Sequence, residues 1–257
     1  MFELQIFPDA RSAELACARM VIDQVRSKPD SVLGLATGKT MINVYDILWK
    51  WENDLEINFS RVTTFNLDEY LGVNAQCRDS FHAFMRRNFF SLLNQPPSAI
   101  HILDGAAADP EEECRRFEFL IRQSGGIDLQ LLGLGRNGHI GFNEPGSGFD
   151  SRTRVVDLSE NTRLYYLKNL IELREVPKQA LTMGIATIME ARNIVLLVTG
   201  AAKAEALYRV VKGPVDEKVP GSVLFLHPAA KILADREAAA EILASEPKVI
   251  RLERKEG

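Results

Sequence analysis

The chain has 257 residues, of which 46% are hydrophobic and 26% are charged, and its formal net charge is −4. This composition is that of an ordinary globular protein and lacks the basic excess of a nucleic-acid-binding protein. No apolar run is long enough to span a membrane, and no basic segment with an apolar core opens the chain, so we expect a cytoplasmic protein. The three cysteines (Cys17, Cys77 and Cys114) are far apart, which favours a reducing compartment over a disulfide framework or a zinc site.

Hydrophobic periodicity predicts strands that alternate with helices, and Asp9 is the predicted N-cap of the first helix. This alternation is typical of an α/β fold with a doubly wound, mostly parallel sheet and helices on both faces, Rossmann-like and three-layered. Because no linker or internal repeat interrupts the pattern, we expect one domain over residues 1–257. The predicted elements are strand Leu4–Phe7, helix Ala10–Ser27, strand Ser31–Ala36, helix Met41–Trp51, strand Val62–Phe65, helices Ser80–Leu93 and Pro110–Ser124, a central strand from Leu129, strand Ile194–Thr199, helix Ala202–Val211, strand Ser222–Leu226 and helix Arg236–Ala244.

The stretch Leu129–Pro145 is the centre of the pattern. It begins as an apolar run typical of a strand buried on both faces and continues into a glycine-rich loop that carries Asn137, His139 and Glu144. An amide, an imidazole and a carboxylate at the end of a buried strand indicate an active site. The alternative is a glycine-rich turn with one solvated histidine, but the density of groups that transfer protons favours the site.

A second signal follows the strand Ser31–Ala36. Thr37, Gly38, Lys39 and Thr40 lead into a helix, and a helix N-terminus offers free N–H groups to a phosphate. The spacing is not that of a Walker A loop. An ordinary strand–helix turn capped by threonine is an equally good reading of this segment alone.

Two further strand ends carry charged side chains. Asp68 and Glu69 follow one strand, and because neighbouring side chains of an extended segment point in opposite directions, at most one of them faces a given site. Lys203 falls in the first turn of a helix, which is unfavourable for a cation unless an anion binds there; an exposed lysine is the alternative. A doubly wound sheet places its strand ends along one edge. Such an edge would suit proton transfer on a phosphosugar.

The segment Leu132–Pro145 (Leu-Gly-Leu-Gly-Arg-Asn-Gly-His-Ile-Gly-Phe-Asn-Glu-Pro) resembles the signature of the glucosamine-6-phosphate deaminases, also called isomerases. The resemblance extends over nearly the whole chain, through Leu35–Thr40, Phe65–Tyr70 and Leu197–Lys203 among other segments. The related 6-phosphogluconolactonases share the Gly-His pair but do not usually continue with Gly-Phe-Asn-Glu-Pro, so the deaminase branch fits better.

The resemblance implies the deamination of glucosamine 6-phosphate to fructose 6-phosphate and ammonia, without a metal or other cofactor. It implies that Asp68 carries the C2 proton to C1, that His139 opens the sugar ring, and that Asn137 and Glu144 orient its imidazole. By the same resemblance, the phosphate is bound by Thr37, Gly38, Lys39, Thr40, Lys203 and a lid cation, either Lys168 or Arg163.

Some alternatives stay open. A galactosamine-6-phosphate deaminase would carry similar motifs, whereas a non-catalytic sugar-phosphate sensor would not need Asp68 and His139 together. The expected partner is a small amino sugar phosphate, not a nucleic acid or a membrane. The oligomeric state is open between a monomer and a homo-oligomer. Allosteric relatives place basic groups after the signature, where this chain keeps Arg154 but continues with Val156 and Asp157, so we expect no allosteric activation.

Overall fold

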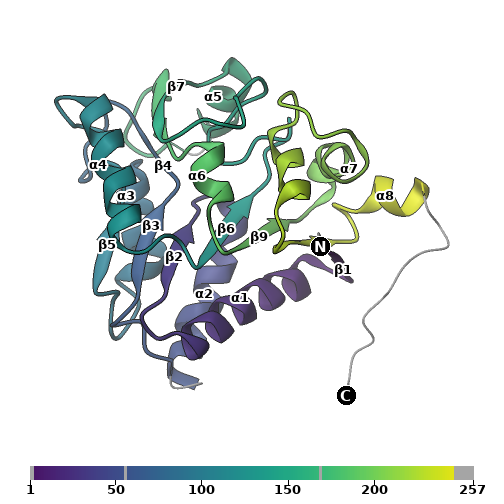
Figure 1. Ribbon diagram of the computed structural model, residues 1–257, viewed down its shortest axis with the longest axis horizontal. Helices are drawn as coiled ribbons and strands as arrows, with labels where there is room; N and C mark the ends of the chain where they lie inside the picture. Colours follow the sequence, from purple (N-terminus) through teal and green to yellow (C-terminus); the bar gives the residue numbers. More distant parts are fainter. Residues whose placement is uncertain (1–2, 55–56, 168–169, 246–257) are drawn as a thin grey trace.

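The computed structural model describes residues 3–54, 57–167 and 170–245, and its centre is a seven-stranded sheet (Figure 1). All pairings between its strands are parallel, as the sequence predicted. The central strands are almost wholly apolar and buried, because helices cover both faces of the sheet. The strand order is β1 (Glu3–Phe7), β10 (Ala230–Asp235), β9 (Asn193–Val198), β6 (Leu129–Gly133), β2 (Val32–Leu35), β3 (Thr63–Asn66) and β5 (Ala99–His101).

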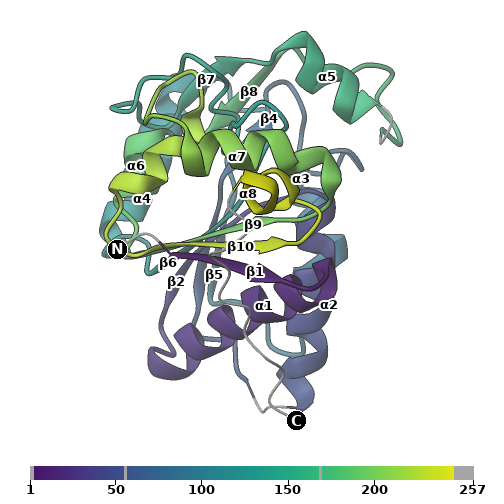
Figure 2. The same cartoon turned by 90° about the vertical axis from the view of Figure 1, so that its right-hand side faces the viewer.

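Helices lie on both sides of this sheet (Figure 2). On one side are α1 (Ala10–Ser27) and α2 (Lys39–Asp54); on the other are α6 (Ile185–Met189) and α7 (Ala204–Lys212). The bounds of α1 are those predicted, since the Asp9 carboxylate accepts a 2.8 Å hydrogen bond from the Ser12 N–H and caps the helix. No helix in the described part of the chain is both long and apolar enough to cross a membrane. The doubly wound α/β architecture is therefore confirmed.

A second, antiparallel sheet lies beyond one edge of the first (Figure 2). It consists of β4 (Asp68–Tyr70), β8 (Gln179–Thr182) and β7 (Arg154–Asp157), none of which the periodicity predicted. Leu67 joins the two sheets: its N–H donates to Leu35 O at 3.0 Å, and its carbonyl accepts from Met183 N at 2.7 Å. The small sheet therefore holds Asp68 close to the ends of the parallel strands.

Two predicted elements have a different structure. The predicted helix Ser80–Leu93 is a short α3 (Phe81–Met85) that continues as the π-helical turn η1 (Arg86–Phe90). The predicted strand Ser222–Leu226 is wrong: this segment belongs to the 3-10 helix η3 (Pro220–Leu226), and the last strand is β10. Pro220 opens η3, and a short apolar run is ambiguous between strand and helix.

The remaining helical elements connect these layers. They are α4 (Pro110–Gln123), α5 (Glu160–Leu167), the 3-10 turn η2 (Ala201–Lys203) and α8 (Ala240–Ser245). Of these, α4 begins as predicted, with Pro110 in its first turn and Asp109 as its cap. Phe117 of α4 packs edge-on against Phe65 of β3, with ring centroids 5.4 Å apart, which fixes α4 on that face of the sheet.

Candidate active site

Four neighbouring strands end along one edge of the parallel sheet. In the order β9, β6, β2 and β3 they end at Val198, Gly133, Leu35 and Asn66. The chain leaves β2 toward β3 and β5, and it leaves β6 toward β9 and β10, so the winding reverses between β2 and β6. Such a reversal opens a crevice at the carboxyl ends of the strands, where α/β proteins bind ligands. The predicted site segments all leave from this edge.

The loop after β6 lays the imidazole of His139 against its own backbone. A Cβ atom on Gly135 would come within 2.3 Å of His139 Nε2, so only glycine fits at this position. The backbone holds the turn closed, because Gly135 N donates to His139 O at 2.8 Å. The imidazole therefore lies directly against the backbone of Gly135, two residues after the end of β6.

The three predicted side chains of this loop form one cluster. Asn137 Nδ2 donates to Glu144 Oε2 at 2.6 Å, and His139 Nδ1 lies 3.5 Å from the same oxygen, an ion-pair distance at the outer limit of a hydrogen bond. Burial raises the pKa of Glu144, but the contacts of His139, Thr162 and Asn137 outweigh it and lower that pKa to about 2. Glu144 is therefore a carboxylate at neutral pH and lies beside the imidazole, whose buried Nδ1 forms no hydrogen bond with the described residues.

Two hydroxyl groups that sequence reasoning missed complete this cluster. Ser159 Oγ donates to Glu144 Oε1 at 3.1 Å, and the hydroxyl of Thr162 donates to the same oxygen. Ser159 also caps α5, where its Oγ accepts from Thr162 N at 3.2 Å. The spacing of this serine and threonine signals a helix start, but nothing in the sequence connects them to a glutamate in another loop.

Asp68 is the first residue of β4 and is 6% exposed. Its Oδ2 lies 3.7 Å from the position of a Cβ atom on Gly141, in the loop that bears His139. Within the described part of the chain its carboxyl group accepts no hydrogen bond. Burial, and then the negative charge of Glu69, raise the pKa of Asp68 to about 8. Asp68 can therefore both release and hold a proton near neutral pH.

The candidate phosphate site lies between the loops after β2 and β9. Thr37, Gly38 and Thr40 are partly buried at the start of α2, where Gly38 has a φ of +105°, whereas Lys39 is exposed. Lys203 ends η2 immediately before α7. Burial, and then the charge of Arg136, lower the pKa of Lys203 to about 8.

Arg136 is a further basic residue of the candidate phosphate site, and the sequence did not predict it there. It lies in the loop after β6, and its charge acts on the largely buried Lys203. An anion bound near both cations would offset the repulsion between them.

The two predicted lid cations are only partly described. Lys168 lies outside the described residues. Arg163 of α5 donates from Nε to Val176 O at 3.3 Å, and its guanidinium lies 4.0 Å from Glu175. These contacts hold Arg163 against its own segment, so the structure does not bring it to the candidate phosphate site.

The model of the family described as glucosamine-6-phosphate isomerases/6-phosphogluconolactonase matches residues 9–237. The chain belongs to this family. A glucosamine-6-phosphate deaminase of Rhodopirellula baltica is 48% identical over 243 residues, which are 95% of this chain and 96% of that protein. The solved structure of a monomeric glucosamine-6-phosphate deaminase has a TM-score of 0.90 and 43% identity, and the match covers 93% and 99% of the two chains.

The lactonase branch of the family shares the fold at lower identity. The 6-phosphogluconolactonase of Trypanosoma brucei is 20% identical, with a TM-score of 0.70 over 94% of this chain and 99% of that one. This likeness concerns the arrangement of the elements alone. The deaminase branch therefore provides the closer comparison for the site.

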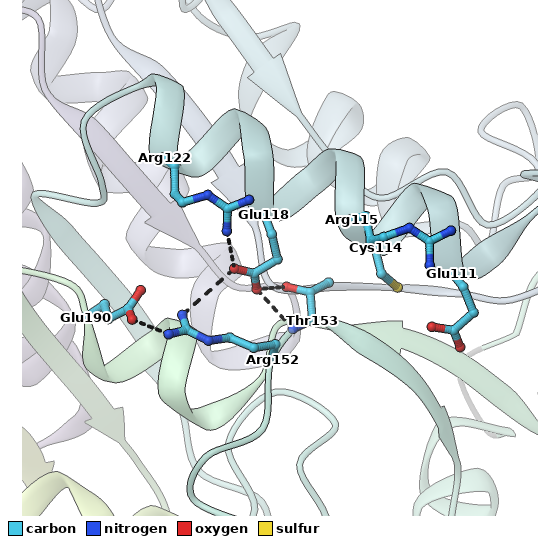
Figure 3. A pocket seen from close by; sticks show the side chains of 8 residues that line it. All are labelled: Glu111, Cys114, Arg115, Glu118, Arg122, Arg152, Thr153 and Glu190. Atoms are coloured by element: carbon cyan, nitrogen blue, oxygen red, sulfur yellow. Dashed lines mark hydrogen bonds and ion pairs between the residues drawn. The ribbon is translucent and has the colours of Figure 1, made fainter.

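A separate pocket of about 480 Å³ lies between α4 and the segment before β7 (Figure 3). It shares no residue with the crevice at the strand ends. Its walls are held together by Glu118, whose Oε1 accepts from Thr153 N at 3.0 Å and from Thr187 Oγ1 at 2.5 Å. Its lining residues are Glu111, Cys114, Arg115, Glu118, Arg122, Arg152, Thr153 and Glu190. Ion pairs join Glu118 to Arg122 and Arg152, and Arg152 to Glu190, so these charges connect α4 with the segment before β7 and the end of α6.

Proposed function

We propose that the chain deaminates and isomerises glucosamine 6-phosphate to fructose 6-phosphate and ammonia. The observation that carries this proposal is the buried Asp68, whose pKa is raised to about 8 beside the loop of His139. The deaminases among its relatives support the choice of reaction. Within the proposed single domain, each chemical step has a residue of the right chemistry near the crevice.

Asp68 acts on the carbon atoms of the opened sugar. It removes the proton from C2 and returns it to C1, which converts the aldose into a 2-imino sugar. Water then adds to the imine, and ammonia leaves as the ketose forms. A carboxyl group with a pKa near 8 is matched to this role, because it is basic enough to take the proton and acidic enough to give it back.

His139 acts on the oxygen atoms of the sugar ring. Its Nε2 side lies over Gly135, and Glu144 lies on its Nδ1 side. A carboxylate in this place fixes the tautomer and stabilises a positive charge on the ring. His139 can therefore move a proton between the ring oxygen and the O1 hydroxyl as the ring opens, and Asn137 holds Glu144 in place.

The phosphate binds between the loop Thr37–Thr40 and Lys203. The free N–H groups at the start of α2 and the two cations Lys203 and Arg136 provide complementary charge. Such contacts are remote from C1 and C2, so they stabilise the bound substrate and the transition state alike.

The direct test is ammonia release from glucosamine 6-phosphate and galactosamine 6-phosphate, measured side by side. We expect the gluco substrate to have the higher kcat/KM. Hydrolysis of 6-phosphogluconolactone in a parallel assay tests the other branch of the family and is expected to be absent. Lactone hydrolysis without ammonia release would overturn the proposal, and a preference for the galacto sugar would reassign the substrate.

A further inference from the structure

Glu69 follows Asp68 in β4, and its side chain is wholly buried on the opposite side of the strand. Its Oε1 accepts from Tyr70 N at 2.8 Å and from Phe81 N at 3.0 Å. Its Oε2 accepts from the N–H of His82 at 3.0 Å and from Nδ1 of the same residue at 2.9 Å. Three backbone N–H donors and one imidazole nitrogen thus converge on the two carboxyl oxygens, an arrangement suited to a carboxylate.

This carboxylate cannot reach the substrate. Its methylene groups pack against Gly105, where a Cβ atom would come within 3.2 Å of Glu69 Cγ. Three of the groups that contact it come from the start of α3, and the fourth is the N–H of Tyr70. Since Asp68 turns toward Gly141 instead, only the first of the two adjacent acids faces the crevice. A catalytic role for Glu69 is therefore excluded by its place in the fold.

The two acids are nevertheless close enough to interact. Successive Cα atoms are about 3.8 Å apart, so the two carboxyl groups lie within roughly 10 Å of each other. Both are buried, and a field between buried groups is screened far less than one in water. No described residue donates a hydrogen bond to Asp68 that would compensate for the charge of Glu69.

Other polar groups come from the elements around Asp68, and the side-chain amide of Asn66 is buried without a hydrogen-bond partner among the described residues. From α2, the hydroxyl of Tyr45 donates to Ala36 O at 2.5 Å. From β8, Thr182 Oγ1 accepts from Phe142 N at 3.1 Å. In the loop after β6, His139 Nδ1 lies 3.5 Å from Glu144 Oε2 without forming a hydrogen bond. Lys203, from the loop after β9, belongs to the candidate phosphate site.

We propose that Glu69 is a positioning residue of the reaction: its buried charge keeps a proton on Asp68 and so sets the pH above which Asp68 acts as a base. This inference rests on the proposed deaminase function. This role explains why the carboxylate of Glu69 is held at a buried position that does not contact the substrate. Without this charge, Asp68 would be a weaker base toward the C2 proton. The pKa of Asp68 is raised by burial and then by the charge of Glu69, which is consistent with this role.

The experiment is the pH dependence of kcat/KM for ammonia release in Glu69→Gln, compared with the unmodified chain. Loss of the charge lowers the proton affinity of Asp68, so the midpoint of the acid limb is expected to move down by about one pH unit. A purely structural role would lower the rate at every pH and leave the midpoint in place.

His82 provides a test of opposite sign. His82→Leu removes the Nδ1 donor, exposes Asp68 to more of the charge on Glu69 and is expected to move the midpoint up. His82→Asn keeps an N–H donor and is expected to return the midpoint to its value in the unmodified chain. This pair also decides the matter if Glu69→Gln does not fold: an unmoved midpoint in His82→Leu would overturn the proposal.

The matched control is Glu118→Gln. Glu118 is also a buried glutamate that accepts a backbone hydrogen bond, from Thr153 N, but it lies on α4 in the separate pocket (Figure 3). We expect the acid limb of the pH profile of Glu118→Gln to have the same midpoint as that of the unmodified chain. A shift as large as that of Glu69→Gln would overturn the proposal.

The titration of the Asp68 carboxyl carbon by NMR gives a readout that needs no turnover. If the unmodified chain releases no ammonia, the proposed function fails, but the Asp68 titration still reports on Glu69. If ammonia is released and the Asp68 titration is the same in Glu69→Gln, only the inference about Glu69 fails.

Discussion

Asp68 and Gly141 meet across the junction of the two sheets: Asp68 Oδ2 lies 3.7 Å from where a Cβ atom on Gly141 would be, and Thr182 Oγ1 lies 3.1 Å from it. Gly141 has a φ of +56°, in the left-handed region. A side chain at this position would touch Asp68 at an ordinary contact distance but would crowd Thr182 and strain the backbone of the His139 loop.

Gly141→Ala is expected to lower kcat by about tenfold or more, because the added methyl group crowds Thr182, and a shift of Thr182 moves its strand partner Asp68. The left-handed backbone adds a loss of ~1–2 kcal/mol in the free energy of unfolding. Gly146→Ala is the control: its φ is +95°, but no atom lies within 4 Å of the added methyl group. The control should lose stability and keep its kcat, and equal kcat in the two variants would contradict the close approach.

Asp68→Asn should reduce kcat by ~10²-fold or more and leave substrate binding largely intact, because it removes the proton carrier but none of the phosphate contacts. The measurement is steady-state ammonia release together with a direct binding assay. A variant that retained more than about a tenth of the kcat would exclude Asp68 as the base.

The same variant should change how stability depends on pH. The pKa of Asp68 is raised from 3.8 to about 8 in the folded chain, so between these values the folded state holds a proton that the unfolded state has lost. This costs stability as the pH rises, by up to about 1.4 kcal/mol per pH unit. Asp68→Asn should therefore gain stability over the unmodified chain between pH 4 and about pH 8. Denaturant titrations at several pH values that show a constant difference would rule this out.

Lys203→Ala is expected to raise KM by about tenfold or more with a smaller effect on kcat, because a contact to the phosphate contributes uniform binding. The control is Lys50→Ala, since Lys50 is exposed and pairs with Asp46 on the surface of α2. An unchanged KM in Lys203→Ala would remove Lys203 from the site.

N-acetylglucosamine 6-phosphate is expected not to activate the enzyme. Arg154 donates to Asn143 Oδ1 at 2.9 Å and to Ser147 Oγ at 3.1 Å, so its guanidinium is engaged within the chain. Val156 offers no hydrogen bond, and Asp157 would repel a phosphate. Substrate saturation curves with and without the effector test this, and a sigmoidal curve that becomes hyperbolic on its addition would reveal a regulatory site made of other residues.

The sequence predicted those parts of the molecule that depend on local pattern and on general topology. The bounds of α1 were predictable because Asp9 caps a regular apolar period. The convergence of Gly38, Asp68, His139 and Lys203 at one edge was predictable because parallel strands of a doubly wound sheet end together.

What could not be predicted depends on contacts between distant segments. Strands of three or four residues, such as β4 and β8, carry too little periodicity to be recognised, and they form only because they pair with one another. The hydroxyl groups of Ser159 and Thr162 reach Glu144 from a later segment of the chain. The run Ser222–Leu226 was misassigned because its apolar residues fit a strand as well as the 3-10 helix that they form.

Because Leu67 bonds to both sheets, the number of residues at the sheet junction is constrained more strictly than the identity of their side chains. Its N–H belongs to one sheet and its carbonyl to the other, so the next residue must turn toward Gly141 and the one after it toward α3. Insertion or deletion of a single residue here would exchange these directions and put the wrong carboxylate into the crevice. Substitutions that keep the main-chain bonds of Leu67 are compatible with the site, whereas a change in residue number at this junction is not.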